Sequence, residues 1–438
     1  MQFSEEVKGT LWNLIDEMSL DLSPFVVCPG KDFSRKKKWD FPTLVKFIIS
    51  MEGQTLKNEL QKYFGYTIDC PTNASFNQRR AQILPEAFEF LFKEFTARYT
   101  ENSGLFKDYR LIACDGSDIN ISHNPNDKDT YFTNGNAKGF NQLHLNAMYD
   151  LTDKMYTDII IQPGRLENEN AAFCDMVDRY TGSKKTIFIA DRGFESYNNF
   201  AHVIEHGNYF LFRCKDIDST GILSGLKYKL PNETIFDCTV SIILTRKKTK
   251  EVLEHPEQYK YFHKKDCLDY IDLNENPYYE IHLRILRFPI SEDTYECIIT
   301  NLSTTEFTMA DIKKIYGMRW GIETSFRELK YAVGLTNFHA KKREYIFQEI
   351  WARLILYNFC EIITAHTVID KCTEKYVYQV NYTFAIHICR YFISKMAEKS
   401  PPDVEALISK EILPVRSERH NPRKVAHKKA VSFLYRVS

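Results

Sequence analysis

The sequence predicts an α/β protein whose strand-rich centre lies between two helical regions. Three observations predict this class. The first hundred residues carry amphipathic helical patterns and few strand-like runs, the middle of the chain alternates short β-rich runs with helical patterns, and a long aromatic helical stretch follows residue 343. We therefore expect five segments, with these boundaries: 1–105, 106–214, 215–300, 301–340 and 341–438.

Composition restricts the kind of partner and the compartment. Lys plus Arg equals Asp plus Glu at 58 each, so a nucleic-acid partner would have to bind local basic patches. The eleven cysteines are scattered, without a CxxC pair or a Cys/His group at zinc-finger spacing. They are typical of a reducing compartment. No signal-peptide pattern and no run of 18 uncharged apolar residues is evident, so we expect a soluble cytoplasmic protein that does not enter a membrane.

The N-terminal segment is predicted to be helical near residues 5–17, 41–63 and 85–99, with Pro85 at a first helical position. A basic run at residues 31–38 is either a solvated face or a DNA contact. We expect this helical region to bind DNA.

The next segment alternates strands and helices. Strand-like runs and helical patterns follow one another in this order: strands at 109–114, 142–149 and 156–161, a helix at 167–180, a strand at 186–190, a helix at 196–206 and a strand at 209–213. This order predicts a layered α/β domain.

Residues 215–300 interrupt the alternation with many short β-like pieces separated by charged turns, which predicts a mostly antiparallel insertion. Helices resume where Thr308 and Asp311 form a capping-box pattern, and Gly334 is a plausible helix end. A helical stretch is expected from about 343 to 397. The tail from residue 416 to 438 carries seven Lys or Arg against one acid.

A polar stripe on the predicted helix around residue 320 is the most informative pattern of the chain. At 100° per residue from Tyr316, Arg319 falls at about 300°, Glu323 at about 340° and Lys330 at about 320°. An apolar stripe lies beside them. One carboxylate among two cations and a phenol suits metal-assisted chemistry on a phosphate backbone. The alternative is a pair of exposed ion pairs of a few tenths of a kcal/mol.

Two further carboxylates stand at the ends of predicted strands. Asp115 follows the first strand and Asp191 follows a later one. Sites in open α/β sheets gather at strand ends, so these two and Glu323 could hold two divalent cations about 4 Å apart. Oxygen ligands favour Mg²⁺ or Mn²⁺ over zinc. A single strand-end Asp is often structural, and Asp118 competes with Asp115 for the first position.

Together these motifs resemble a known family, the DDE transposases of bacterial insertion sequences, and within it the group named after insertion sequence four. The motifs that carry the resemblance are Asp115-Gly-Ser, Asp191-Arg-Gly-Phe, Tyr-x2-Arg-x3-Glu-x6-Lys at 316, 319, 323 and 330, Thr300-Asn-Leu, and Gly334-Leu-x-Asn-Phe-His339. The similarity runs with interruptions from about residue 70 to the C-terminus. Ser117 stands where the family more often has Thr, which should not affect metal binding.

The resemblance implies a ribonuclease-H-like catalytic core interrupted by a β-rich insertion, and Asp115, Asp191 and Glu323 as its catalytic metal ligands. It implies that three further residues contact the phosphates of the element end, namely Tyr316, Arg319 and Lys330. Arg327 is an additional candidate for a phosphate contact, which the signature does not include. Trp320 borders the stripe and either stacks on a base or packs in the core.

The function implied is cut-and-paste transposition. Such a protein binds terminal inverted repeats in double-stranded DNA, cleaves the ends as an endonuclease and joins them to target DNA as a homodimeric synaptic complex. It would work on the bacterial nucleoid. Two alternatives stay open: a metal-dependent nuclease of the same fold that does not join strands, and a catalytically silent DNA-binding regulator.

Overall fold

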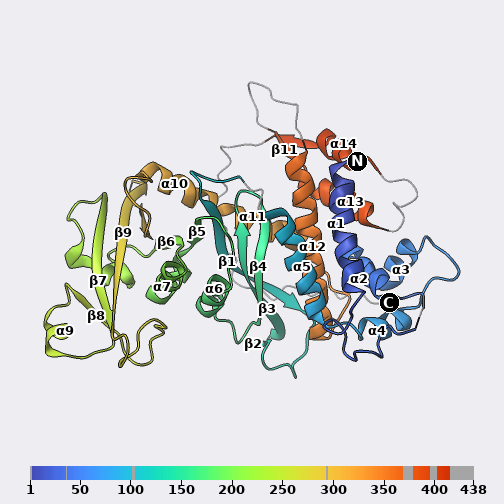
Figure 1. The fold of residues 1–438 in the computed structure, drawn as a ribbon, viewed down its shortest axis with the longest axis horizontal. Coiled ribbons are helices and arrows are strands. Elements are labelled where there is room, and N and C mark those ends of the chain that lie inside the picture. The colour runs from blue at the N-terminus through green and yellow to red at the C-terminus, as the bar shows by residue number, and fades with distance from the viewer. Residues whose placement is uncertain are drawn as a thin grey trace.

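The structure is a computed structural model that describes residues 2–35, 37–100, 104–135, 137–292, 294–367, 378–394 and 402–414. It is a mixed α/β protein built on one central mixed sheet (Figure 1). Helices from the two ends of the chain gather beside each other at one side of this sheet, and the strands β7 to β9 form its opposite end. The predicted basic tail, residues 416–438, lies outside the described residues.

Five helices precede the sheet in the part of the chain that the structure describes. They are α1 (Phe3–Met18), α2 (Phe41–Ser50), α3 (Leu56–Tyr63), α4 (Asn73–Arg80) and α5 (Pro85–Thr100). A single helical pattern was expected over residues 41–63, but the structure divides this stretch into two helices, α2 and α3. The turn between them is held by Glu59, whose carboxylate accepts the backbone N–H groups of Glu52 and Gln54. Thr55 then caps α3 by accepting the N–H of Asn58.

The central sheet has ten strands among the described residues. They are β1 (Arg110–Ile121), β2 (Tyr131–Asn134), β3 (Ala137–Asp150), β4 (Met155–Pro163), β5 (Thr186–Ala190), β6 (Tyr209–Cys214), β7 (Phe236–Thr245), β8 (Tyr259–Tyr261), β9 (Tyr278–Ser291) and β10 (Thr294–Thr300). β4, β3 and β1 pair antiparallel, whereas β1, β5 and β6 pair parallel. The parallel pairs are connected by α6 (Glu169–Asp178), the short helix η1 (Arg192–Phe194) and α7 (Tyr197–Glu205).

Residues 215–300 continue the same sheet beyond β6. β10 pairs antiparallel with β6 and β9, and β9 pairs antiparallel with β7, while the short β8 runs parallel to β7. Three short helices decorate this end, namely α8 (Ile222–Gly225), η2 (Lys227–Lys229) and α9 (Lys250–Glu254). The strand-rich stretch is therefore an extension of the central sheet in its hydrogen bonding.

The chain returns to helices after β10. They are α10 (Met309–Met318), α11 (Trp320–Tyr331), α12 (Arg343–His366), α13 (Tyr382–Ile393) and α14 (Val404–Lys410), with the short strands β11 (Tyr378–Val380) and β12 (Ile412–Pro414) paired antiparallel. The expectation of helix throughout 343–397 was wrong, because β11 interrupts it. No helix among the described residues is long and apolar enough to cross a membrane.

Helix α12 connects the N-terminal helices with the C-terminal helices through buried contacts. It packs on α5, α2 and α13, and Glu349 forms an ion pair of 2.8 Å with Arg80 from α4. Both side chains are almost completely buried. Removing one member of such a pair leaves an uncompensated charge, so this contact fixes how the N-terminal helices dock.

Alternation along β1 separates the two faces of the sheet. Leu111 and Ala113 belong to the core shared with α10, α11 and α12, whereas Ile112 and Cys114 belong to the core shared with α6 and α7. The pairing with β3 continues without a bulge to Ile121. Asp115 therefore falls on the face covered by α11, and Gly116 and Asp118 fall on the face covered by α6.

Candidate active site

Asp115 and Asp191 stand next to each other where the pairing of β1 with β5 ends. Cys114 of β1 is the partner of Ala190, the last residue of β5, so Asp191 follows the end of its strand. Asp115 instead lies inside β1, which continues paired with β3 to Ile121, so the expected strand end after residue 114 was wrong. Asp191 caps η1, where its Oδ1 accepts the N–H of Gly193 at 2.7 Å. Asp191 therefore has the structural capping role that was considered for a strand-end Asp. This cap uses Oδ1 only, and Oδ2 takes no part in it.

Glu323 reaches the same place from α11 through a shared arginine. Arg319 Nη1 lies 3.3 Å from Asp115 Oδ2, and Arg319 Nη2 lies 2.6 Å from Glu323 Oε1. Arg319 is only 6% exposed. The alternative of an exposed surface ion pair is therefore wrong, because the guanidinium lies inside and links the helix to β1.

The polar stripe of α11 faces the polar end of β1. Lys330 Nζ donates to Ser117 Oγ at 2.7 Å, two residues beyond Asp115 on the same face. Burial lowers the pKa of Lys330 despite the opposing charge of Asp118. Lys330 and Arg319 thus hold α11 along this part of the strand.

The expected single helix through the stripe is instead two helices that meet at Arg319. α10 ends at Met318, and the N–H of Arg319 bonds to the carbonyl of Tyr316 in a tighter turn. Tyr316 therefore belongs to α10, is 7% exposed and carries the Arg319 guanidinium 5.7 Å from its ring centroid. The turn brings Arg319 toward Asp115 while Tyr316 stays in the core.

The site carries more negative charge than its cations neutralise. The pKa of Asp115 is raised to about 6, mainly by burial; the charges of Asp191 and Glu323 add to this shift, and Arg319 and the Gly116 N–H oppose it. These three carboxyl groups therefore interact electrostatically in one neighbourhood. Below about pH 6 the Asp115 carboxyl keeps a proton.

These carboxylates are near one another without forming a closed cage. Among the described residues, the one group of three or more metal-ligating side chains whose atoms all lie within 4.8 Å is Asp118, His144 and Glu167. Asp115 and Glu323 are instead bridged by the Arg319 guanidinium. The donor set is carboxylate oxygen in a region short of positive charge, which fits hard divalent cations such as Mg²⁺.

Two side chains of α11 lie on its outer surface. Arg327 is exposed, and Trp320 is 54% exposed, so the alternative of Trp320 as a core residue is wrong. Both line a groove of about 1060 Å³, together with Lys154, Tyr331 and other residues. An aromatic ring and cations beside a groove are the groups that contact single or distorted DNA strands.

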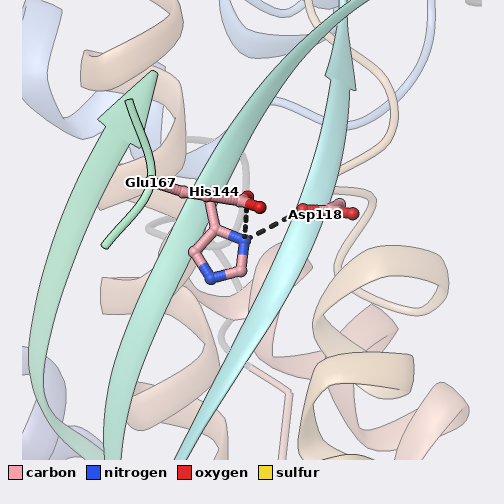
Figure 2. Close-up of side chains that lie close together, drawn as sticks. All are labelled: Asp118, His144 and Glu167. Carbon is pink, nitrogen blue, oxygen red and sulfur yellow. Dashed lines mark hydrogen bonds and ion pairs between the residues drawn. The ribbon is translucent and has the colours of Figure 1, made fainter. Parts of the chain in front are cut away.

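The opposite face of β1 carries a second polar cluster, which the sequence did not predict (Figure 2). Asp118 points to His144 on β3, so it does not compete with Asp115 for the first position. Burial disfavours the charged ring, but the carboxylates of Asp118 and Glu169 outweigh it and raise the pKa of His144 to about 9. A histidine that alternates with leucines at 143 and 145 on a predicted strand was the available signal.

Comparison with known proteins identifies the class of this chain. A family profile described as "Transposase DDE domain" matches residues 106–359, which is more than half of the chain. The chain therefore belongs to the transposase DDE domain family, and the predictions of a DDE transposase and of an enzyme acting on DNA are confirmed at that level. Such domains use divalent metal.

No curated protein matches the chain. Among solved structures, it is similar to a piggyBac transposase in a synaptic complex with hairpin DNA, with 9% sequence identity, a TM-score of 0.45, and coverage of 97% of this chain and 84% of that chain. A likeness of this degree carries no argument about the site.

Proposed function

We propose that this chain is a transposase of the insertion-sequence-four group that cleaves the ends of its element and joins them to target DNA. The observation that carries the proposal is that Asp115 and Asp191 stand side by side where the pairing of β1 with β5 ends, and that Arg319 links Glu323 to Asp115. The signature spacing of Tyr316, Arg319, Glu323 and Lys330 supports the narrower group.

A ribonuclease-H-like core is part of this proposal. Its support is the strand order β4-β3-β1-β5-β6, with three antiparallel strands followed by two parallel ones. In this proposal the core comprises residues 106–214 and 301–340, residues 215–300 are its β-rich insertion, and residues 1–105 and 341–438 flank it. The N-terminal helices and the basic tail would recognise terminal inverted repeats.

Asp115, Asp191 and Glu323 are the proposed ligands of two Mg²⁺ or Mn²⁺ ions. The grouping of these carboxylates around one buried guanidinium supports this role, because surplus negative charge favours cation binding at neutral pH. When bound, such ions activate an attacking water or DNA 3′-hydroxyl and stabilise the leaving oxygen of an in-line displacement. Arg319 orients two of the carboxylates from the protein side.

DNA contacts are proposed for four residues, which differ in exposure and in their present partners: Tyr316, Arg319, Lys330 and Arg327. Arg327 is exposed and can meet a phosphate directly. Lys330 would exchange its bond to Ser117 for a phosphate oxygen. Tyr316 and Arg319 are buried, so their part is to hold α11 and the carboxylates, and a direct contact requires DNA to enter the site. A homodimer on double-stranded DNA completes the proposal.

The two alternatives make different products. A nuclease of the same fold would cleave the ends without forming joined strands, and a silent regulator would bind without cleaving. The three acidic residues favour an enzyme over a regulator, since a regulator has no need for them.

A strand-transfer assay tests the proposal. Purified protein is incubated with labelled DNA ends from either side of its coding sequence, target DNA and Mg²⁺, and nicks, hairpins and joined products are scored. Glu323→Gln should bind the ends and form no joined product, whereas the matched surface change Glu344→Gln should behave as the unmodified protein. Magnesium-dependent joining by Glu323→Gln would refute the catalytic assignment.

A further inference from the structure

The cluster of Asp118, His144 and Glu167 has the composition of a metal site distinct from the three proposed catalytic acids. Its members come from three different places: β1, β3 and the connection between β4 and α6. One ligand atom from each lies within 4.8 Å of the others. Figure 2 shows both carboxylates directed at the same nitrogen of the ring.

Two carboxylate oxygens compete for one ring nitrogen, His144 Nδ1. His144 Nδ1 lies 2.9 Å from Asp118 Oδ1 and 3.3 Å from Glu167 Oε2. A ring nitrogen carries at most one proton, so it can donate a good hydrogen bond to only one of these oxygens. A cation in place of that proton would be shared by the nitrogen and both oxygens.

The other ring nitrogen lies near a carboxylate, although the two do not meet in hydrogen-bond geometry. His144 Nε2 lies 3.1 Å from Glu169 Oε1. A carboxylate this close to the far nitrogen favours the proton there, which leaves the lone pair of Nδ1 for the metal side. His144 is 6% exposed, so the ring is held in this orientation by its surroundings.

Gly116 keeps the space that this arrangement requires. A Cβ at position 116 would lie 2.4 Å from His144 Nε2 and 2.2 Å from Glu169 Oε1. Both contacts are shorter than any side chain tolerates. A larger residue at position 116 would therefore push the ring or the Glu169 carboxylate away from the β1 backbone.

Charge also favours a cation here. Three carboxylates, from Asp118, Glu167 and Glu169, surround one imidazole. A protonated ring leaves a charge of about −2, whereas a divalent ion on the neutral ring leaves about −1. One nitrogen and two oxygens form a mixed donor set that suits Zn²⁺ or Mn²⁺ better than Mg²⁺.

We propose that Asp118, His144 and Glu167 bind one divalent transition-metal ion, with Glu169 orienting the histidine. The ion would fasten the connection before α6 to β1 and β3, on the face of β1 opposite Asp115. This site is structural, and the proposal stands whether or not the chain joins DNA strands.

Zinc binding to the full chain tests the proposal. The background carries Asp115→Asn and Glu323→Gln to weaken the proposed catalytic metal site. This protein is stripped with chelator, equilibrated with buffered Zn²⁺, and its metal content is measured per chain. Adding His144→Gln should remove one equivalent of bound Zn²⁺. Adding His255→Gln, which alters an exposed histidine paired only with Glu257, should remove none.

A second variant distinguishes loss of the metal site from loss of the fold. Glu167 is about half exposed in its connection, so Glu167→Gln should preserve the fold while abolishing the Zn²⁺-dependent rise in melting temperature. Mg²⁺ at the same concentration should give no such rise. The proposal is overturned if the background protein binds no Zn²⁺, or if His144→Gln and Glu167→Gln retain its stoichiometry and its melting shift.

Discussion

The substitution Asp115→Asn should stabilise the metal-free protein while removing a proposed catalytic ligand. Burial and neighbouring charges raise the pKa of this carboxyl from 3.8 to about 6. Ionising it in the folded protein at pH 8 therefore costs about 3 kcal/mol. Asn avoids this cost and keeps an oxygen for the Gly116 N–H at 2.9 Å. It weakens the contact with Arg319 at 3.3 Å, worth about 1 kcal/mol. The net gain should be about 2 kcal/mol.

The pH dependence follows from the direction of the shift. The Asp115 pKa is higher in the folded than in the unfolded chain, so its cost is absent below pH 3.8, grows as pH rises, and is complete above about pH 6. At pH 5 the cost is about 1.5 kcal/mol, and the gain from Asn shrinks to about 0.5 kcal/mol.

Urea unfolding in chelator at pH 8 and pH 5 measures these differences. Asp216→Asn is the matched control of opposite sign, because a hydrogen bond from Arg287 is the main cause that lowers the pKa of Asp216 to about 2. That variant should be less stable than the unmodified protein at pH 8. An Asp115→Asn protein that is destabilised at pH 8, or whose gain is larger at pH 5, would refute the electrostatic account of the site.

Three further predictions address single contacts. Arg319→Met should raise the pKa of Asp115 above about 6, because it removes the nearest cation, and an unchanged carboxyl titration by NMR would contradict this. Arg80→Met should cost about 3–5 kcal/mol in urea unfolding, because Glu349 stays buried without its partner, and a loss below about 1 kcal/mol would count against it. Arg327→Ala should lower the salt slope of end binding by about one, because one phosphate contact is lost, and an unchanged slope would contradict that contact.

The sequence predicted part of the arrangement around the proposed site. Asp191 follows a short apolar strand as expected, and Asp115 lies beside it because β1 and β5 pair in parallel register, although β1 runs on to Ile121. The helical period also put Arg319, Glu323 and Lys330 on one side of a helix. Period alone does not say which element that side meets, so the bridge from Arg319 to Asp115 could not be predicted.

Other features depend on contacts between distant segments. The turn at Arg319 divides the expected helix, and Gly317 and Gly321 on either side of it were the available signal, although a glycine alone does not decide that a helix breaks. The pairing of β1 with β3 puts His144 opposite Asp118, and this register decides the face on which Asp118 lies. The turn at residues 51–55 likewise depends on Glu59, which lies outside it and closes it through two hydrogen bonds.

The most direct test of the central claim is a crystal structure of the protein with an element end and Mn²⁺, examined for anomalous scattering. The account predicts strong manganese peaks coordinated by carboxylate oxygens of Asp115, Asp191 and Glu323 beside the scissile phosphate. The account would be contradicted if the element end is bound and manganese is present elsewhere, but no manganese peak lies at these three side chains.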